Sequence, residues 1–482
     1  MHVFARLLKR GNVSSQRVTI LARFCGLLAI LSLAGLLAGP AAAAPLATRT
    51  VLDNGAILLL AERPGVPMVV MNITLKTGST ADPVDKAGVA NLTALLLTRG
   101  TQQHTAQALA EALDFLGTSV SVSADYETTT VLVTSLTKNL EASFGLLAEV
   151  LLHPTFPAEE FERKRTEVLG SIRSQEEDPG WVANKAFQEK LYAEHPFGRL
   201  IDGEPDTLAA LSRADIVDFY RSYYRPNNAI IGIAGDLTQA QAQDVLTRHL
   251  GGWQAAPLPP LNWPTDPAPA AAQVLIDRPV SQANIILGHP GVARHNPDIY
   301  AIRVMNYILG AGGFGSRLND RIREELGLVY SVGSRFSSRK HAGPFRIVLQ
   351  TKNASAKQAI EEAVGIMRRY IEEGATAAEF DAAKAYLVNS YPLGLVSNRQ
   401  IATLLPALEF YELGLDYPDR YPSIIQALSL DQIRAVAKKY LHPDQLLQVV
   451  VANLEQAELT PPTPELPAEA TANPSQPREQ PS

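Results

Sequence analysis

Cysteine is nearly absent from this chain of 482 residues. The single cysteine, Cys25, lies close to the N-terminus, so the rest of the chain offers no disulfide, no thiolate ligand for zinc and no thiol nucleophile. Long hydrophobic runs are also lacking, since no segment after the N-terminal region reaches the ~20 apolar residues that a membrane-spanning helix needs. The sequence therefore argues against a disulfide-stabilised scaffold, a cysteine-dependent enzyme and stable membrane insertion.

An excess of positive charge is absent as well. The formal net charge is −6. Five of the 43 basic residues and none of the 49 acidic residues lie in the first 44 positions, so residues 45–482 carry a formal charge of −11. A chain of that sign has no general attraction for nucleic acid or anionic lipid. Its length predicts at least two domains, and its hydrophobic content of 46% is typical of globular proteins.

The N-terminus has the order of a secretory signal peptide. Basic residues up to Arg23 precede an apolar run over 24–37, and a Gly-Pro pair separates this run from the small residues of "AAAAPLA". The run of about 14 apolar residues is too short for the alternative, a membrane anchor. We predict a signal peptide over residues 1–43, cleaved after Ala43, and an exported protein that is most simply periplasmic in a bacterium.

The chain contains an internal repeat. "LSRADIVDFYRSYYRPNNAIIGIAGDL" (211–237) matches "LSLDQIRAVAKKYLHPDQLLQVVVANL" (428–454) without a gap. Each copy predicts a helix with a serine N-cap, a turn marked by proline, and a buried aliphatic strand. A second pair of similar segments begins at Leu136 and at Gln350. The repeat predicts a duplicated α+β unit.

Composition places the domain boundaries. Residues 256–273 are dense in Pro and Ala and poor in charge, as in a semi-rigid linker. The C-terminal residues have no apolar periodicity and many prolines. The predicted order is a signal peptide (1–43), an N-terminal lobe (44–255), a linker (256–273), a C-terminal lobe (274–455) and a disordered Pro-rich tail (456–482).

Several segments in a fixed order carry a family resemblance. They are "TGSTADPVDKAGVANLTALLLTRGT", "FPAEEFERKRTEVLGSIRSQEEDP", "HPFGRLIDGEPDTLAALSRADIVDFYRSYYRPNN" and "FGSRLNDRIREELGLVYSV". Over most of residues 48–455 the chain resembles the insulinase/pitrilysin (M16) zinc metallopeptidases, in particular the two-domain processing-peptidase type. The resemblance implies an α+β fold with two homologous α/β-sandwich lobes of the LuxS/MPP-like metallohydrolase type, and paired chains that enclose a peptide chamber.

Active members of that family carry an inverted zinc motif, His-x-x-Glu-His, on the helix that begins here at "AGVAN". The two imidazoles share one helical face, and the glutamate deprotonates zinc-bound water. In this chain the three positions hold Asn91, Ala94 and Leu95, and the position of the third ligand, a glutamate, holds Ser171. No two of the remaining histidines have helical ligand spacing. The resemblance thus implies no catalytic residue and no metal site of its own.

The family's substrate-binding pair is present. Active assemblies use an Arg and a Tyr from a C-terminal lobe, seven residues apart, to bind and polarise the scissile peptide. In "RIREELGLVY" the matching residues are Arg323 and Tyr330. A guanidinium and a phenol can both donate hydrogen bonds to an oxyanion. The structural alternative is an arginine paired with Glu324 or Glu325 and a tyrosine packed at the start of a strand.

The glycine-rich "GAGGFG" (Gly310–Gly315) formally fits a dinucleotide-binding pattern, but a helical pattern precedes it where a strand is required. A turn between two helices is the better interpretation. It leaves backbone free to approach an extended peptide.

Three functions remain open from the sequence. The first is a zinc-free subunit of an exported two-chain metallopeptidase, whose homologous zinc-bearing partner supplies the metal and whose substrate is a peptide or unfolded polypeptide. The second is a non-proteolytic peptide-binding or scaffold protein of the same fold. The third, an enzyme active alone through other ligands, is the least favoured.

Overall fold

The computed structural model describes residues 46–261 and 263–460. The predicted signal peptide and most of the predicted tail lie outside these residues. Within them, no helix is both long and apolar enough to cross a bilayer.

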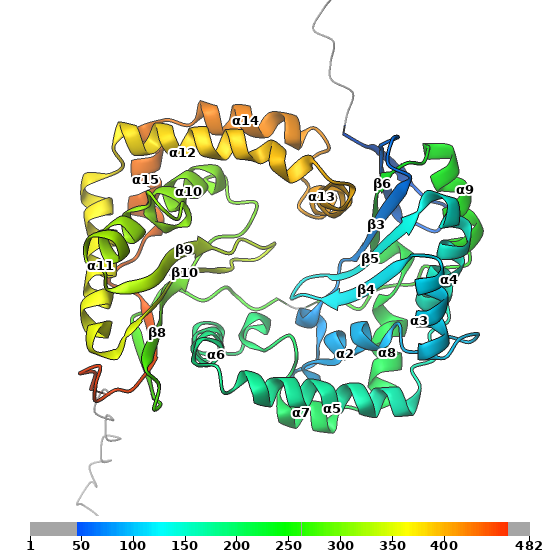
Figure 1. Cartoon of the computed structure of the whole chain (residues 1–482), viewed down its shortest axis with the longest axis horizontal. Coiled ribbons are helices and arrows are strands. Elements are labelled where there is room, and N and C mark those ends of the chain that lie inside the picture. Colours follow the sequence, from blue (N-terminus) through cyan, green and yellow to red (C-terminus); the bar gives the residue numbers. More distant parts are fainter. Residues whose placement is uncertain (1–45, 262, 461–482) are drawn as a thin grey trace, which may run out of the picture. The chain divides into compact units, whose positions relative to one another are not determined.

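The first half of the chain forms a six-stranded mixed sheet (Figure 1). Its spatial order is β1-β2-β6-β3-β5-β4. Neighbours are antiparallel except β2 and β6, which run parallel. The strands are β1 (Thr48–Val51), β2 (Ile57–Glu62), β3 (Met68–Leu75), β4 (Ser119–Ala124), β5 (Thr129–Leu136) and β6 (Ala229–Gly235).

The second half forms a five-stranded sheet in the order β7-β11-β8-β10-β9. Here β7 and β11 are the parallel pair. Without β1, the first sheet has the same connectivity as the second. Its parallel pair, β2 and β6, corresponds to β7 and β11. The predicted duplication and the two-lobed α+β fold are therefore confirmed. The strands are β7 (Ala272–Asp277), β8 (Gln282–Pro290), β9 (Val329–Phe336), β10 (Pro344–Lys352) and β11 (Leu447–Ala452).

Helices cover one face of each sheet and form the two main cores with it. The serines predicted to cap the repeated helices do so: Ser212 accepts from the N–H of Asp215, and Ser429 from that of Gln432. The first core uses α2 (Val89–Leu96), α3 (Ala106–Phe115), α4 (Leu140–Leu152), α5 (Ala158–Gln175), α7 (Pro205–Ala210), α8 (Arg213–Tyr223) and α9 (Gln239–Leu250). The second uses α10 (Ile299–Asn306), α11 (Ala356–Glu373), α12 (Ala377–Ser390), α13 (Asn398–Phe410), α14 (Tyr417–Ala427) and α15 (Leu430–Tyr440).

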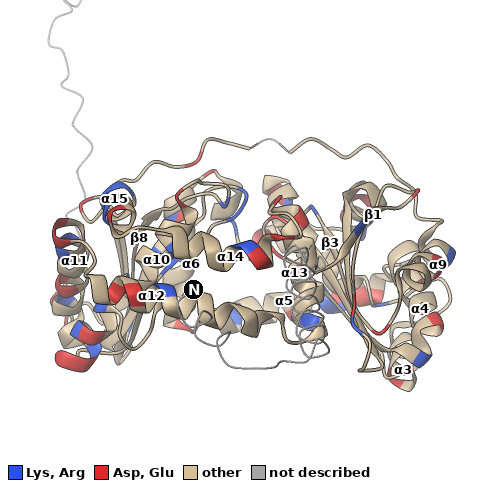
Figure 2. Cartoon of the chain, turned by 90° about the horizontal axis from the view of Figure 1, so that it is seen from above, with Lys and Arg blue, Asp and Glu red and all other residues tan. Residues whose placement is uncertain are grey.

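The opposite face of each sheet is covered by a helix from the other half of the chain. Helix α6 (Pro179–Tyr192) packs on β8 and β11, and α13 packs on β3 and β6. Figure 2 shows α13 beside β3. A glycine in each sheet permits the close approach. A Cβ at Gly232 would lie 2.6 Å from the carbonyl oxygen of Ala402, and one at Gly288 would lie 2.7 Å from the Phe187 ring.

The sequence analysis assigned neither β4 nor β7. Strand β4 lies at a sheet edge, and its side chains alternate between exposed and half-buried. Strand β7 begins at Ala272, inside the segment predicted as linker, and the described residues from 253 to 271 form no helix or strand. Residues 456–460, assigned to the disordered tail, include the buried Ala457. The predicted domain boundaries otherwise stay predictions.

Candidate functional site

Helix α2, where active members carry the inverted zinc motif, begins beside a buried aspartate side chain. Gly88 precedes the helix with a φ of 97°, in the left-handed region that favours glycine. Asp82, only 5% exposed, accepts the backbone N–H groups of Gly88 (2.8 Å) and Ala90 (3.1 Å). Burial raises the pKa of Asp82 to about 8, although these two donors and the charge of Arg199 act in the opposite direction. The start of the helix is thus held by a side chain unrelated to metal binding.

The four positions aligned with zinc ligands and base do not fit a zinc ion. The Asn91 side chain is buried and donates to the Asp202 carboxylate at 2.9 Å. Ala94 and Leu95 carry no donor atom, and Ser171 is exposed and accepts from Gln175 Nε2 at 3.1 Å. Zinc sites in proteins use thiolate, imidazole or carboxylate ligands, and none of these four residues carries such a group.

Three of the remaining histidines have structural partners. Residues 46–261 and 263–460 contain no group of three or more His, Cys, Asp or Glu placed to hold a metal ion. His104 and His249 each contact a single glutamate at 2.8 Å. His289 is buried with its Nδ1 2.8 Å from the Pro290 carbonyl oxygen, and burial lowers its pKa to about 4. Each of these three histidines therefore has a structural environment.

Arg323 and Tyr330 lie close together in the C-terminal half. Arg323 belongs to a π-helical segment, Asn319–Glu325, and Tyr330 is the second residue of β9. The guanidinium carbon of Arg323 lies 5.9 Å from the centre of the Tyr330 ring. Tyr330 is 79% exposed, so it is not packed in the core at the start of its strand, and that part of the structural alternative is wrong.

The guanidinium has a second aromatic neighbour that the sequence analysis missed. Phe314, in the glycine-rich turn, is 72% exposed, and its ring centre lies 4.7 Å from the guanidinium carbon of Arg323. Arg323 also approaches Glu324 at 3.7 Å, the ion pair considered as the alternative. An aromatic residue inside a run of glycines was the only signal available for Phe314.

The glycine-rich turn lies between two helical segments, as predicted. Helix α10 and a π-helical turn, Tyr307–Ala311, precede it, and the π-helical segment that holds Arg323 follows it. Gly313 and Gly315 have φ values of 61° and 89°. A strand does not precede the turn, so the context of a dinucleotide-binding motif is absent. π-Helical turns are rare and occur frequently at functional sites.

The arrangement can donate hydrogen bonds to an acceptor outside the chain. Arg323 is one-third exposed, and no hydrogen bond from Tyr330 Oη occurs among the described residues. A guanidinium and a phenol on one exposed surface suit the carbonyl oxygen of a bound peptide. The use of this pair in substrate binding stays a prediction.

Comparisons with known proteins agree with the fold. A model described as insulinase (peptidase family M16) matches residues 58–203, and one described as peptidase M16 inactive domain matches residues 210–387. The chain is 24% identical to an uncharacterized zinc protease, YmxG, of Bacillus subtilis, over 83% of this chain and 97% of that protein. It is 26% identical to the "non-peptidase homolog YmxG" of Helicobacter pylori, over 80% of this chain and 90% of that protein.

Solved structures share the fold. The crystal structure of a peptidase M16 inactive domain from Pseudomonas fluorescens superposes with a TM-score of 0.80 and 29% sequence identity, over 84% of this chain and 98% of that one. Both halves of the chain match M16 domains, and the positions of the zinc motif hold residues that cannot bind the metal. The chain therefore belongs to the peptidase M16 (insulinase) family, as a member of its inactive type.

Proposed function

We propose that this chain is the zinc-free subunit of an exported, two-chain M16 metallopeptidase. A homologous partner chain would carry the zinc motif and the metal. This chain would supply Arg323 and Tyr330, which bind the substrate peptide, and part of the wall of the peptide chamber.

The observation that carries the proposal is that the Arg323 guanidinium lies over two exposed aromatic rings, at 4.7 Å from the centre of Phe314 and 5.9 Å from the centre of Tyr330. An arginine with a purely structural role would be expected to form close ion pairs or to lie within a core. Here the nearest carboxylate oxygen, on Glu324, is 3.7 Å away, and the neighbouring rings face solvent. The rings restrict the guanidinium without neutralising it.

The chemistry required of the two residues is the donation of hydrogen bonds. During peptide hydrolysis, negative charge develops on the former carbonyl oxygen, and the partner's zinc would supply the attacking water. Arg323 would offer a permanent positive charge to that oxygen, and Tyr330 would offer its phenolic O–H. Both interactions would strengthen as charge develops, so they would lower the barrier more than they improve ground-state binding.

The test is reconstitution with a zinc-bearing M16 chain from the same cell. Arg323→Ala and Tyr330→Phe should leave the complex intact by size and leave its zinc content unchanged. Turnover should fall by ~10²–10³ for the loss of one oxyanion donor. The matched control is Arg321→Ala, in the same π-helical segment, because Arg321 pairs with Glu325 and Glu362 instead of facing Phe314.

Full activity in both variants would contradict the proposal and favour the scaffold function, which has no use for an oxyanion donor. Equal losses in the Arg321 control would contradict it too, because the effect would then come from the segment as a whole.

Export rests on the signal-like order of residues 1–43. Mass spectrometry of the chain recovered from the periplasm should give an N-terminus near Ala44. A full-length chain recovered from the cytosol would contradict this part of the proposal.

A further inference from the structure

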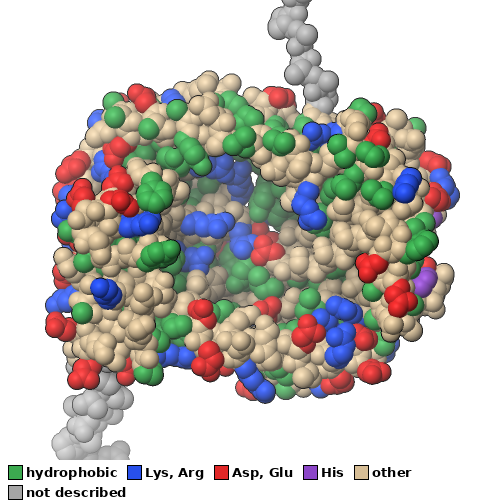
Figure 3. All heavy atoms as spheres, in the orientation of Figure 1, with side chains coloured by type: hydrophobic (Ala, Val, Ile, Leu, Met, Phe, Trp, Pro, Cys, Tyr) green, Lys and Arg blue, Asp and Glu red, His purple; other side chains and the backbone are tan. Residues whose placement is uncertain are grey.

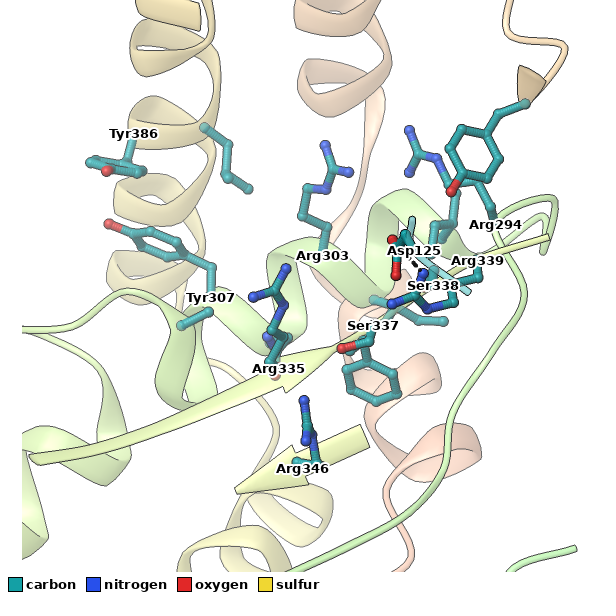
Figure 4. Close-up of a pocket in the computed structure, with 17 residues that line it drawn as sticks. Asp125, Arg294, Arg303, Tyr307, Arg335, Ser337, Ser338, Arg339, Arg346 and Tyr386 are labelled. Atoms are coloured by element: carbon teal, nitrogen blue, oxygen red, sulfur yellow. Dashed lines mark hydrogen bonds and ion pairs between the residues drawn. The ribbon is translucent and has the colours of Figure 1, made fainter. Parts of the chain in front are cut away.

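A cavity of about 680 Å³ in the C-terminal half has an unusual concentration of positive charge. Its lining comes mainly from α10 and the turn after it, and from the end of β9 and the loop that follows, with Asp125 contributed by the N-terminal half. Figure 3 shows basic side chains gathered in a hollow of the displayed face, and Figure 4 shows the lining residues. Five arginines line the cavity, against one carboxylate: Arg294, Arg303, Arg335, Arg339 and Arg346.

The single carboxylate, Asp125, is already paired. Its Oδ2 lies 2.9 Å from Arg339 Nη1. No other Asp or Glu lines the cavity, so the remaining four guanidinium groups have no opposite charge there. The sequence as a whole is acidic, with a formal charge of −6, so general basicity of the chain does not explain the cluster.

Neutral groups hold three of these arginines in place. Arg294 and Arg303 donate to the hydroxyls of Tyr417 (3.2 Å) and Tyr421 (3.3 Å). Arg346 donates to the Asn184 side chain at 2.8 Å. Such acceptors orient a guanidinium but leave its charge uncompensated.

Arg335 and Arg346 form a like-charged pair across two strands. They occupy directly opposite positions of β9 and β10, on the face of the sheet that α6 covers. The pKa of Arg346 is lowered by burial and then by the charge of Arg335. Like charges directly opposite each other destabilise a sheet. Figure 4 shows the two guanidinium groups projecting in the same direction, with Arg303 of α10 beside them.

Packing alone accounts for part of this arrangement. Arg303 and Arg346 lie over the rings of Tyr421 (5.5 Å) and Phe187 (6.0 Å). Arg335 is exposed, and its side chain has no hydrogen bond or ion pair among the described residues. An exposed arginine directly opposite another arginine, with no counter-charge, is a feature that packing does not require.

We propose that this cavity binds an acidic segment of a polypeptide. Guanidinium groups bind carboxylates through paired, parallel N–H···O bonds, and several arginines along one wall suit successive Asp or Glu side chains. The stacked rings of Tyr307 and Tyr386, 4.9 Å apart, line the same cavity and offer apolar contact to the stems of those side chains. A cavity of this size accommodates several side chains, whereas a single small anion would contact only some of the arginines.

Binding here requires neither zinc nor a partner chain. If the proposed function holds, this binding would define a class of substrate for it. The inference itself does not depend on the proposed function. Failure of the peptidase reconstitution would leave this inference intact, and the reverse also holds.

The test uses fluorescence anisotropy with the full-length mature chain and a short fluorescein-labelled peptide rich in glutamate. Wild type should bind this peptide, and affinity should fall as salt rises, because the ionic contacts are screened. Arg335→Gln should weaken binding about tenfold or more, since one charge-assisted contact is lost. Arg346→Gln serves as a second variant on the neighbouring strand.

The matched control is Arg368→Gln on α11, an exposed arginine paired with Asp444 outside the cavity. It should bind like wild type. Three results would overturn the proposal: no binding by wild type, an equal loss in the Arg368 control, or equally tight binding of a serine-rich peptide of the same length. Displacement of the acidic peptide by an equal concentration of inorganic phosphate would also overturn it, since the site would then be a small-anion site.

Discussion

The guanidinium carbon of Arg323 lies 4.7 Å from the centre of the Phe314 ring. Phe314 lies in the glycine-rich turn, and Arg323 lies in the π-helical segment after it. The contact therefore depends on both elements keeping their present geometry. Phe314 contacts the Arg323 guanidinium, so we assign it a positioning role in the proposed function.

We expect Phe314→Ala to lower kcat/KM of the reconstituted complex by about two- to fivefold, because an exposed cation–π contact contributes about 0.5–1 kcal/mol. Phe314→Tyr should restore the wild-type value, since a phenol ring provides the same contact. Zinc content and complex size should not change. An alanine variant with wild-type kcat/KM would mean that Phe314 does not position Arg323.

Metal content is the second prediction. Positions 91, 94, 95 and 171 present an amide, a methyl group, an aliphatic chain and a hydroxyl. We expect elemental analysis of the purified chain to find no stoichiometric zinc after incubation with the metal and desalting. Near-equimolar zinc, together with peptide cleavage that a chelator abolishes, would contradict this expectation.

Most of the fold could be predicted from the sequence because it depends on local patterns. The aliphatic runs of the repeat predicted β6 and β11, and the repeated serine caps predicted the equivalent helices α8 and α15. Strand β4 alternates Ser with Val at a sheet edge, where little apolar surface is buried, so its pattern is weak. The exchange of α6 and α13 between the halves could not be predicted, because each helix meets residues about a hundred or more positions away.

The candidate site, too, could be predicted from the sequence only in part. The loss of zinc ligands could be read from Asn91, Ala94 and Leu95, since the resemblance aligns them with a short, fixed motif. Phe314 follows no periodicity, so nothing in the sequence connected it with Arg323. The opposition of Arg335 and Arg346 depends on the register of β9 against β10, which the sequence does not fix.

The contact between the two halves gives a third prediction. A methyl group at Gly232 would lie 2.6 Å from the Ala402 carbonyl oxygen and would also meet Pro406 on α13. We expect Gly232→Ala to lower the free energy of unfolding by about 1–3 kcal/mol in urea denaturation, because overpacking forces the helix to shift.

The control is Gly170→Ala within α5, where an added Cβ meets no atom within 4 Å. That variant should gain about 0.5–1 kcal/mol through helix propensity and lower unfolded-state entropy. Equal stability of Gly232→Ala and wild type would mean that α13 does not rest on β6 as described.

The fourth prediction concerns pH. The pKa of Asp82 is about 8 in the folded chain, against an ordinary value near 3.8. The folded state therefore holds a proton that the unfolded state has released. The stability that this proton provides is complete below about pH 4 and is lost as the pH rises to about 8. We expect the free energy of unfolding to fall less between about pH 4 and about pH 8 in Asp82→Asn than in wild type. Asp53→Asn, at an exposed position, should keep the wild-type slope.

The fifth prediction separates a binding role for the arginine cavity from a structural one. Arg335 and Arg346 repel each other across β9 and β10, and Arg335 has no counter-charge among the residues that line the cavity with it, apart from the already paired Asp125. Removal of one charge should therefore stabilise the free protein. We expect Arg335→Gln to raise the free energy of unfolding by about 0.2–1 kcal/mol at low salt, the size of a cross-strand pair interaction. The gain should shrink at high salt, where the repulsion is screened.

The same variant should bind the glutamate-rich peptide more weakly, so stability and affinity would move in opposite directions. If Arg335 were retained for packing, its removal would loosen the cavity wall and lower both the stability and the peptide affinity. Measurement of thermal unfolding and peptide anisotropy on one preparation distinguishes the two cases. A less stable Arg335→Gln variant would identify Arg335 as a structural residue, and the charge on the cavity wall would then need no ligand to explain it.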